Sequence, residues 1–252
     1  MPEPLVVVIS GVGRGIGNAL ARSYLSRPNC TVVGSVRDES APGVADLQAV
    51  AAANHEAKLL IVKIESASEA DAKKAVQRMR AAGIDHVDIL IANAGVSPPI
   101  VGLETVELAS VESAFRVNTL GPLALYQACH GLLLRSRSPK LITMSSKAGS
   151  IGDMSSLRAW KAPAYCISKA ALNWITVSAH FGNDRLVSVA VSPGLVDSDM
   201  GNKTAREHMG LEAAPITMAD SAEKIIKLID GATRDNVSGK FIGAIDGEEI
   251  PW

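Results

Sequence analysis

The chain has 252 residues, 47% of them hydrophobic, and a formal net charge of −1 at neutral pH. A chain of this size can bury a substantial core, and we expect residues 1–252 to form one domain. The balanced charge gives no indication of nucleic acid as a partner. No stretch reaches the roughly 18 to 20 apolar residues of a membrane span, and no signal peptide is evident, so we expect a cytoplasmic protein with no membrane partner.

Short apolar runs alternate with longer stretches of helical periodicity along the whole chain. The expected strands are Leu5–Ser10, Thr31–Val36, Lys58–Ile64, Val87–Ala92, Lys140–Ser145, Leu186–Val191 and Lys240–Ile245. The clearest helical stretches are Ile16–Leu25, Glu69–Ala82, Val111–Leu134 and Ala164–Phe181. The strand runs are nearly continuous in apolar residues, as strands covered on both faces are. This order predicts an α/β fold, a single-domain Rossmann-type doubly wound parallel sheet of about seven strands with helices on both faces.

A glycine-rich run follows the first expected strand and opens the first expected helix. It reads Ser10-Gly11-Val12-Gly13-Arg14-Gly15-Ile16-Gly17. Glycine lacks the Cβ that would keep a ligand away from the backbone, and the N–H groups at a helix start carry partial positive charge. Because ligands of doubly wound sheets bind beyond the carboxyl ends of the strands, the run predicts a loop that binds the pyrophosphate of a dinucleotide.

Tyr165 and Lys169 are four residues apart in an expected helix, so their side chains share one face. A free tyrosine titrates at about pH 10, and a nearby ammonium group favours its phenolate form. We expect Lys169 to lower the pKa of Tyr165 and so to tune a proton donor for neutral pH. A tyrosine and a lysine at the edge of an ordinary amphipathic helix would give the same spacing.

The glycine spacing G-x-x-x-G-x-G, from Gly11 through Gly15 to Gly17, resembles that of the short-chain dehydrogenase/reductase family. The resemblance continues in order through "NAG" at Asn93–Gly95, "VNTLGP" around Asn118, "ITMSS" ending at Ser146, "YCISK" at Tyr165–Lys169 and "SPGLVDSDM" from Ser192. Several motifs in the family's order are more specific than any one of them. More loosely, "VVGSVRDES", "WKAPAYCISKAALN" and "DGEEIPW" resemble the fungal norsolorinic-acid-ketoreductase-like and sniffer-type carbonyl reductase branch.

The resemblance implies a catalytic set of Asn118, Ser146, Tyr165 and Lys169. In these roles Tyr165 protonates the carbonyl oxygen, Lys169 holds the nicotinamide ribose hydroxyls, and Asn118 supports a water that leads to the lysine. Ser146 donates a hydrogen bond to the carbonyl, because the family's serine leads into a turn containing "AG", here Ala148-Gly149. Ser145 is the alternative.

The resemblance also implies NADP(H) as the cofactor. Glu65 and Ser66 stand where the family has an acidic and a small residue against adenine, with glutamate in place of the usual aspartate. The other expected cofactor contacts are Ser10, Gly11, Gly13, Arg14, Gly15, Ile16, Gly17 and Arg37, then Asn93, Ala94 and Gly95 at the ribose end, Tyr165 and Lys169, and Pro193, Gly194, Val196 and Ser198 at the nicotinamide and its carboxamide.

The second expected strand ends without the aspartate that NAD-selective members of the family usually carry. Val36 stands in that position and Arg37 follows. With no carboxylate to repel a phosphate, we expect Arg14 and Arg37 to clamp the 2′-phosphate of NADPH through charge-assisted hydrogen bonds. The plainer interpretation is that both arginines are solvated at the surface. Asp38, next to Arg37, would also neutralise part of its charge.

The stretch Lys147–Ala164 is longer than the family's usual connection and forms an extended loop at the substrate end. The apolar candidates for a pocket wall, or for ordinary packing, are Met154, Trp160, Met200, Met209 and Leu211. We therefore expect reduction of a bulky apolar or aromatic, polyketide-like ketone or aldehyde to an alcohol, a reaction typical of secondary metabolism. A cofactor-binding regulatory scaffold, or a non-redox dehydratase or cyclase, remains an alternative on the same fold.

The expected partners are a small-molecule carbonyl substrate and other copies of the chain. The family resemblance implies a homo-oligomer, either dimer or tetramer, with a monomer as the alternative in the carbonyl reductase branch. The five histidines have no metal-binding spacing, and the three scattered cysteines indicate reduced thiols, so we expect no metal.

Overall fold

In the computed structural model, which describes residues 3–252, consecutive residues of the first strand face two separate cores. Val7 and Ile9 of β1 (Leu5–Ser10) belong to one hydrophobic cluster, and Val6 and Val8 belong to the other. Side chains alternate between the two faces of a strand, so a strand that is apolar at every position must be covered on both sides. The continuous apolar runs of the sequence therefore become interior strands.

Seven parallel strands form the sheet in the order β3-β2-β1-β4-β5-β6-β7. After β1 they are β2 (Cys30–Val36), β3 (Ala57–Lys63), β4 (Ile89–Ala92), β5 (Lys140–Met144), β6 (Val187–Ser192) and β7 (Phe241–Gly243). All seven match expected strands: β1 has the expected bounds, and no bound of the other six differs by more than two residues. The strand order reverses between β1 and β4, and ligands of doubly wound sheets bind at such a switch point.

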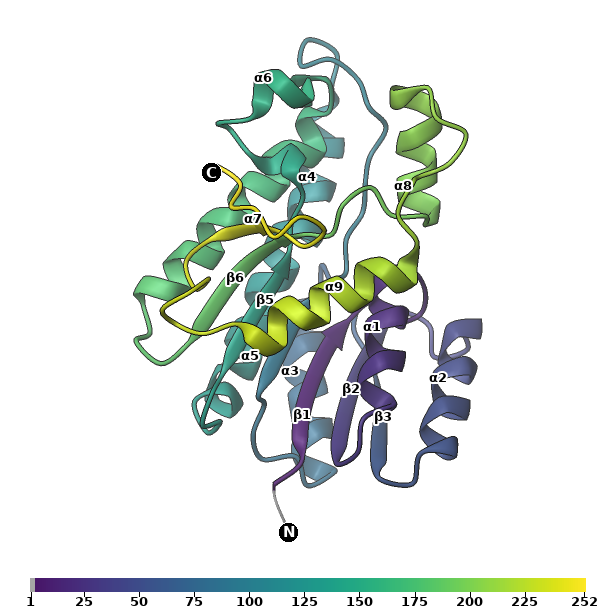
Figure 1. The fold of residues 1–252 in the computed structure, drawn as a ribbon, viewed down its shortest axis with the longest axis vertical. Coiled ribbons are helices and arrows are strands. Elements are labelled where there is room, and N and C mark those ends of the chain that lie inside the picture. The colour runs from purple at the N-terminus through teal and green to yellow at the C-terminus, as the bar shows by residue number, and fades with distance from the viewer. Residues whose placement is uncertain (1–2) are drawn as a thin grey trace.

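Helices cover both faces of the sheet (Figure 1). The face of Val7 and Ile9 is covered by α1 (Gly15–Leu25), α2 (Pro42–Ala53) and α9 (Met218–Gly231). The opposite face is covered by α3 (Glu69–Ala81), α5 (Gly121–Leu133) and α7 (Pro163–Phe181), and α4 (Leu108–Phe115) packs against α7. The α/β doubly wound fold expected from the sequence is confirmed.

Three regions differ from the expected elements. Where one helix was expected over Val111–Leu134, the structure has α4, a π-helix η1 (Arg116–Leu120) and α5 in succession. The helices α2 and α9 lie outside the four stretches singled out above. The expected loop Lys147–Ala164 contains three short helical turns, namely η2 (Lys147–Gly149), α6 (Met154–Leu157) and η3 (Ala159–Lys161).

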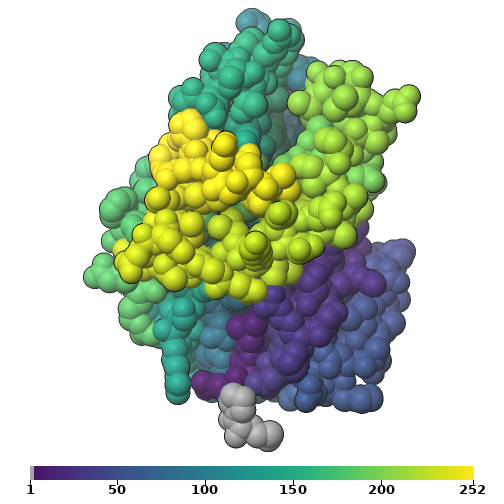
Figure 2. Space-filling model, viewed as in Figure 1, coloured from purple at the N-terminus to yellow at the C-terminus, as the bar shows by residue number. Residues whose placement is uncertain are grey.

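The chain builds two lobes beyond the carboxyl ends of the strands. One carries α6, and the other carries α8 (Asp199–Thr204) with the π-helix η4 (Ala205–Met209). Figure 2 shows the surface hollowed between the teal lobe around α6 and the green lobe around α8. Within residues 3–252, every helix is too short or too polar to cross a bilayer.

Candidate active site

The glycine-rich loop is tied to the chain segment after β4. Ser10 Oγ accepts hydrogen bonds from the backbone N–H groups of Asn93 and Ala94, at 2.9 and 3.0 Å. Asn93 Nδ2 donates back to Ser10 O at 2.9 Å. Gly11 has φ +76°, and a Cβ there would lie 3.1 Å from Ala94 Cα. Glycine is therefore required at position 11 by backbone conformation and by close contact with the neighbouring strand end.

The later glycines of the loop have different surroundings. A Cβ on Gly17 would lie 2.4 Å from both Asn93 Nδ2 and Gly11 O, so Gly17 permits α1 to start close against the strand ends. Gly15 has φ +62°, and a Cβ on it would meet no atom within 4 Å. The space in front of the Gly15 backbone is open, at the start of α1 where N–H groups favour an anion.

Asn118 lies in the π-helix η1 and is fully buried. Its Oδ1 accepts from Val96 N at 2.8 Å, and its Nδ2 donates to Val96 O at 2.9 Å and to Ser168 Oγ at 3.0 Å. The wider π-turn gives this stretch a local geometry that an α-helix does not have, and such turns occur frequently at functional sites. Asn118 thereby connects the loop after β4 to α7.

Lys169 extends from α7 toward the same point. Its Nζ donates to Met144 O at 2.7 Å, and a Cβ on Gly95 would lie 3.6 Å from Nζ and 3.2 Å from Asn118 Oδ1. The lysine is 4% exposed, and burial lowers its pKa to about 8. Among the described residues, Met144 O is the single hydrogen-bond acceptor of Nζ, which leaves two N–H bonds of a buried ammonium available to a ligand.

The two candidate serines have different environments. Ser145 is 3% exposed, and its Oγ donates to Asn173 Oδ1 at 2.6 Å. Ser146 is less buried, its Oγ accepts from Ala148 N at 3.2 Å, and its hydroxyl lies close enough to the Tyr165 side chain to act on the pKa of that residue. The structure therefore places Ser146 beside the tyrosine and engages the hydroxyl of Ser145 elsewhere.

The pKa of Tyr165 differs from the expectation that Lys169 lowers it. Burial raises the pKa of Tyr165 to about 12, while the hydrogen bond with Ser146 acts in the opposite direction. Lys169 Nζ lies 5.7 Å from the centroid of the tyrosine ring and donates to Met144 O instead of the phenol oxygen. Desolvation of the phenol is therefore the largest influence on its pKa, and the tyrosine is held in its protonated form.

The two arginines expected at the 2′-phosphate are both exposed. Arg14 forms an ion pair with Asp199 of α8, which the sequence analysis did not single out. Asp38 does not pair with Arg37, because its Oδ1 accepts from the backbone N–H and the hydroxyl of Ser40, at 2.9 and 2.7 Å. These hydrogen bonds lower the pKa of Asp38.

The other expected cofactor-binding residues described here follow the carboxyl ends of β3 and β6, on the two sides of the switch point. Glu65 and Ser66 follow β3, and a Cβ on Gly121 would lie 2.6 Å from Ser66 O, so Ser66 lies against the start of α5. Gly194 follows β6 with φ +87°. Ser198 caps α8 by accepting from Gly201 N at 3.1 Å, and Val196 is buried.

Comparison with known proteins assigns the family. Residues 5–209 match the family model described as short chain dehydrogenase. The chain belongs to this family. The short-chain dehydrogenases are oxidoreductases, and the family resemblance noted in the sequence is confirmed.

Individual relatives of the short-chain dehydrogenase family cover nearly the whole chain. Short-chain dehydrogenase srdF of Neurospora crassa is 47% identical over 251 residues, which are 99% of this chain and 98% of the relative. Norsolorinic acid ketoreductase of Aspergillus parasiticus is 35% identical over 253 residues, 100% of this chain and 92% of the relative. The crystal structure of NADPH-bound carbonyl reductase from chicken fatty liver has a TM-score of 0.86 and 27% identity, with 100% of both chains covered.

Several residues that shape this short-chain dehydrogenase site were not expected from the sequence. Ser168 links Asn118 to the tyrosine, because its Oγ donates to Tyr165 O at 2.6 Å. Asn173 engages Ser145, and Asp199 engages Arg14. Ser168 and Asn173 could not be singled out, because a serine and an asparagine one and two helical turns after a tyrosine form no distinctive pattern. Asp199 could not be singled out, because its partner Arg14 lies 185 positions away along the chain. Within residues 3–252, no cluster of side chains is suited to hold a metal ion.

Proposed function

We propose that this chain is an NADPH-dependent reductase of ketones or aldehydes, with Tyr165 as the proton donor. The observation that carries the proposal is the placement of the Ser146 hydroxyl beside the Tyr165 phenol, next to the buried ammonium of Lys169. Two neighbouring hydroxyl donors are suited to one carbonyl oxygen, which becomes more negative as the carbonyl is reduced. The names of a ketoreductase relative and of a carbonyl reductase neighbour point the same way.

The residues around the carboxyl edge fit a dinucleotide phosphate. The open space in front of Gly15, at the N-terminal end of α1, suits a pyrophosphate. The two unused N–H bonds of Lys169 suit the hydroxyls of a ribose. The exposed guanidinium groups of Arg14 and Arg37 suit a 2′-phosphate, which favours NADPH over NADH.

In the proposed reaction, NADPH supplies a hydride to the carbonyl carbon when it is bound. Tyr165 donates its phenolic proton to the carbonyl oxygen, so that the carbonyl becomes an alcohol. The raised pKa of Tyr165 keeps the proton on the phenol at neutral pH until the oxygen becomes basic. Ser146 donates a hydrogen bond to the same oxygen, and Asn118 keeps the loop after β4 against α7 so that Lys169 stays in place.

The proposed substrate is a bulky, largely apolar or aromatic ketone. Large hydrophobic side chains are exposed in the segments that form the two lobes on either side of the hollow, and they are Ile151, Met154, Leu157, Trp160, Met200, Met209 and Leu211. Exposed apolar residues that gather around a concave surface are typical of a binding site for an apolar ligand. A polycyclic aromatic ketone would bury more of this surface than a small aliphatic ketone.

A substrate screen tests the proposal. The purified protein is incubated with NADPH and a panel of polycyclic aromatic, monocyclic aromatic and small aliphatic ketones, and loss of NADPH absorbance is followed together with alcohol formation by mass spectrometry. We expect turnover, with higher kcat/KM for the larger aromatic ketones. Tight NADPH binding without reduction of any ketone would favour a cofactor-binding scaffold instead.

A further inference from the structure

The segment 244–252 folds back along the last strand of the sheet. Gly247 has φ +74° in the turn, and Glu249 pairs with Ile242 in an antiparallel bridge. Ile250 N donates to Phe241 O at 2.7 Å, and the Ile250 side chain is buried in a cluster with Phe241 and Ala190. The segment is therefore anchored on the sheet edge rather than loosely attached (Figure 1, yellow).

This segment contacts both ends of the turn η2 (Lys147–Gly149) that follows Ser146, here called the serine turn. At the start of the turn, Lys147 Nζ forms an ion pair with Asp246 Oδ2 at 3.0 Å. Directly after the turn, Ser150 Oγ donates to Pro251 O at 2.6 Å. The next backbone N–H groups, those of residues 151 and 152, donate to Trp252 O at 3.1 and 2.8 Å.

The position of Trp252 is itself fixed by packing. Its ring stacks on the ring of Phe241, with centroids 5.7 Å apart and an interplanar angle of 19°. Phe241 is fully buried in β7, so the stack connects Trp252 to the core. A Cβ on Gly152 would lie 2.9 Å from Pro251 Cβ, so glycine at position 152 permits this close contact.

Contacts outside this segment hold the turn itself, and at Gly149 Asn173 Nδ2 of α7 donates to Gly149 O at 3.4 Å. Lys147 N donates to Ser192 Oγ at 3.1 Å, and Ser145 N donates to Val191 O at 2.8 Å. Ser146 Oγ has one backbone donor, Ala148 N. From Ser150 onward, the chain enters the lobe that carries α6 and η3, which lies at the surface beside the hollow.

We propose that Asp246 and Trp252 are positioning residues that hold the Ser146 hydroxyl at Tyr165 and fix where the 150–162 loop leaves the sheet. This inference rests on the proposed carbonyl reduction. Neither residue touches the reacting atoms; each acts through the backbone of the serine turn. Because a donor displaced by about 1 Å loses much of its effect on a transition state, loosening this segment slows turnover without weakening NADPH binding.

The first test compares Trp252→Ala with Trp252→Phe, and uses Trp174→Ala on the exposed outer face of α7 as a matched control. Hydrogen–deuterium exchange measures the amides of Ile151 and Gly152. We expect exchange about tenfold faster in Trp252→Ala, and close to the wild-type rate in Trp252→Phe, whose ring still stacks, and in Trp174→Ala. Unchanged exchange in Trp252→Ala would overturn the inference, whether or not the protein reduces ketones.

The same variants are then assayed for ketone reduction, with turnover expressed per NADPH-binding site so that an unfolded fraction does not count. We expect Trp252→Ala to lose about tenfold in kcat with the NADPH dissociation constant unchanged, and Trp252→Phe to recover most of the loss. Equal losses in NADPH binding and turnover would show a general structural role and overturn the inference. A wild type that binds NADPH but reduces no ketone would refute the proposed function, and the exchange experiment still tests the segment.

The second test isolates the ion pair. Asp246→Asn keeps an oxygen that accepts from Glu248 N, at 3.1 Å in the structure, and removes the charge that pairs with Lys147. Glu249→Gln is the matched control, because it removes the ion pair of Glu249 with Lys240 in the same segment without touching the serine turn. We expect a loss of a few fold in kcat for Asp246→Asn alone. Equal effects of the two substitutions would contradict a specific role for Asp246.

Discussion

Arg14 in the glycine-rich loop forms an ion pair with Asp199, the first residue of α8. The pair joins the proposed phosphate-binding loop to the lobe that carries α8. The two side chains are 77% and 79% exposed, and exposed ion pairs contribute little net stability and are screened by salt. Asp199 therefore competes with the proposed 2′-phosphate for the same guanidinium without holding it firmly.

Asp199→Asn is expected to strengthen NADPH binding about twofold to fivefold at low salt, because the competing carboxylate is removed. NADH, which lacks the 2′-phosphate, is expected to bind with unchanged affinity. Calorimetry with both nucleotides measures the difference. Glu212→Gln removes a charge from the same lobe without contact to Arg14 and is the control; an equal gain in that variant would indicate a general charge effect.

Arg14→Ala and Arg37→Ala are each expected to lose about tenfold or more in NADPH affinity, because each removes charge-assisted hydrogen bonds to the 2′-phosphate. NADH affinity changes little in both variants. Arg22→Ala, at another exposed arginine of the neighbouring α1, is the control. Equal dissociation constants for NADPH and NADH in the wild type, measured at moderate salt, would refute the assignment of the two arginines.

Tyr165→Phe is expected to lower turnover about 10²- to 10⁴-fold, because the ring still packs while the donated proton is gone. NADPH affinity should stay near the wild-type value. Stopped assays with the best ketone from the screen measure turnover, and Tyr126→Phe on the partly buried face of α5 is the control. Turnover within about tenfold of wild type would rule out Tyr165 as the proton donor.

Substitution of the two adjacent serines is expected to change different properties, namely turnover for Ser146 and stability for Ser145. Ser146→Ala removes the hydroxyl beside Tyr165 and should lower kcat about 10²-fold or more with little change in thermal stability. Ser145→Ala leaves the buried Asn173 Oδ1 without its donor and should cost about 1 to 3 kcal/mol of unfolding free energy, with a smaller effect on kcat. Thermal melts and turnover of both variants decide the assignment, and the reverse pattern would make Ser145 the catalytic serine.

The sheet could be predicted from the sequence because each strand is marked by its own short run of apolar residues. Seven apolar runs separated by helical stretches correspond to the seven observed strands, and doubly wound connections leave few alternative arrangements. The π-helix at Asn118 could not be predicted, because it depends on the contacts of Asn118 with Val96 and Ser168 in other elements. Likewise, the pKa of Tyr165 depends on desolvation, which spacing along a helix does not reveal.

The contacts around the substrate end were the hardest to predict. Asp199, Asp246 and Trp252 act on residues about 100 or more positions away along the chain. A charged or aromatic residue in a loop has no periodic pattern that specifies its partner, so the sequence alone did not reveal these contacts.

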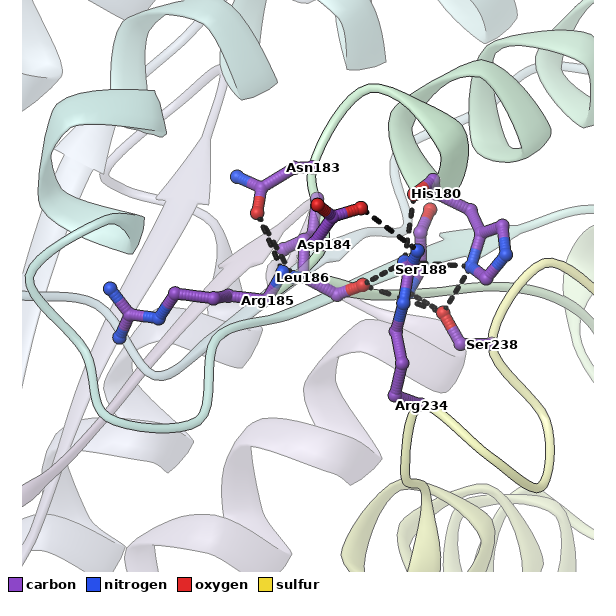
Figure 3. A network of polar contacts seen from close by, with 8 residues as sticks. All are labelled: His180, Asn183, Asp184, Arg185, Leu186, Ser188, Arg234 and Ser238. Atoms are coloured by element: carbon purple, nitrogen blue, oxygen red, sulfur yellow. Dashed lines mark hydrogen bonds and ion pairs between the residues drawn. The ribbon is translucent and has the colours of Figure 1, made fainter.

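A polar network at the C-terminal end of α7 predicts a pH-dependent stability (Figure 3). Arg234 Nη1 donates to His180 Nδ1 at 2.8 Å and to the backbone oxygens of His180 and Leu186, at 2.7 and 2.9 Å. Ser238 Oγ lies 2.8 Å from the same Nδ1. An arginine nitrogen carries protons and accepts none, so Nη1 at 2.8 Å disfavours a proton on Nδ1 and favours the neutral form of His180 in the folded chain.

Burial, followed by the charge of Arg234, lowers the pKa of His180 in the folded state. The unfolded chain therefore binds a proton at His180 more readily than the folded chain does. The stabilising contribution is complete above the unfolded pKa of about 6.5 and is lost as the pH falls below it toward the folded pKa. His86 has a raised pKa and contributes with the opposite sign, so the pH dependence of the wild type alone does not isolate His180.

His180→Asn removes the titration and keeps an acceptor oxygen near the position of Nδ1. Unfolding free energies of the wild type and the variant, measured by urea denaturation between about pH 7.5 and pH 5, should differ most at the high end, with the wild-type advantage shrinking as the pH falls. His55→Asn, at an exposed histidine, is the control and should show no such trend. A wild-type advantage that stays constant or grows toward low pH would mean that His180 is protonated in the folded chain, which contradicts its role as the acceptor for Arg234.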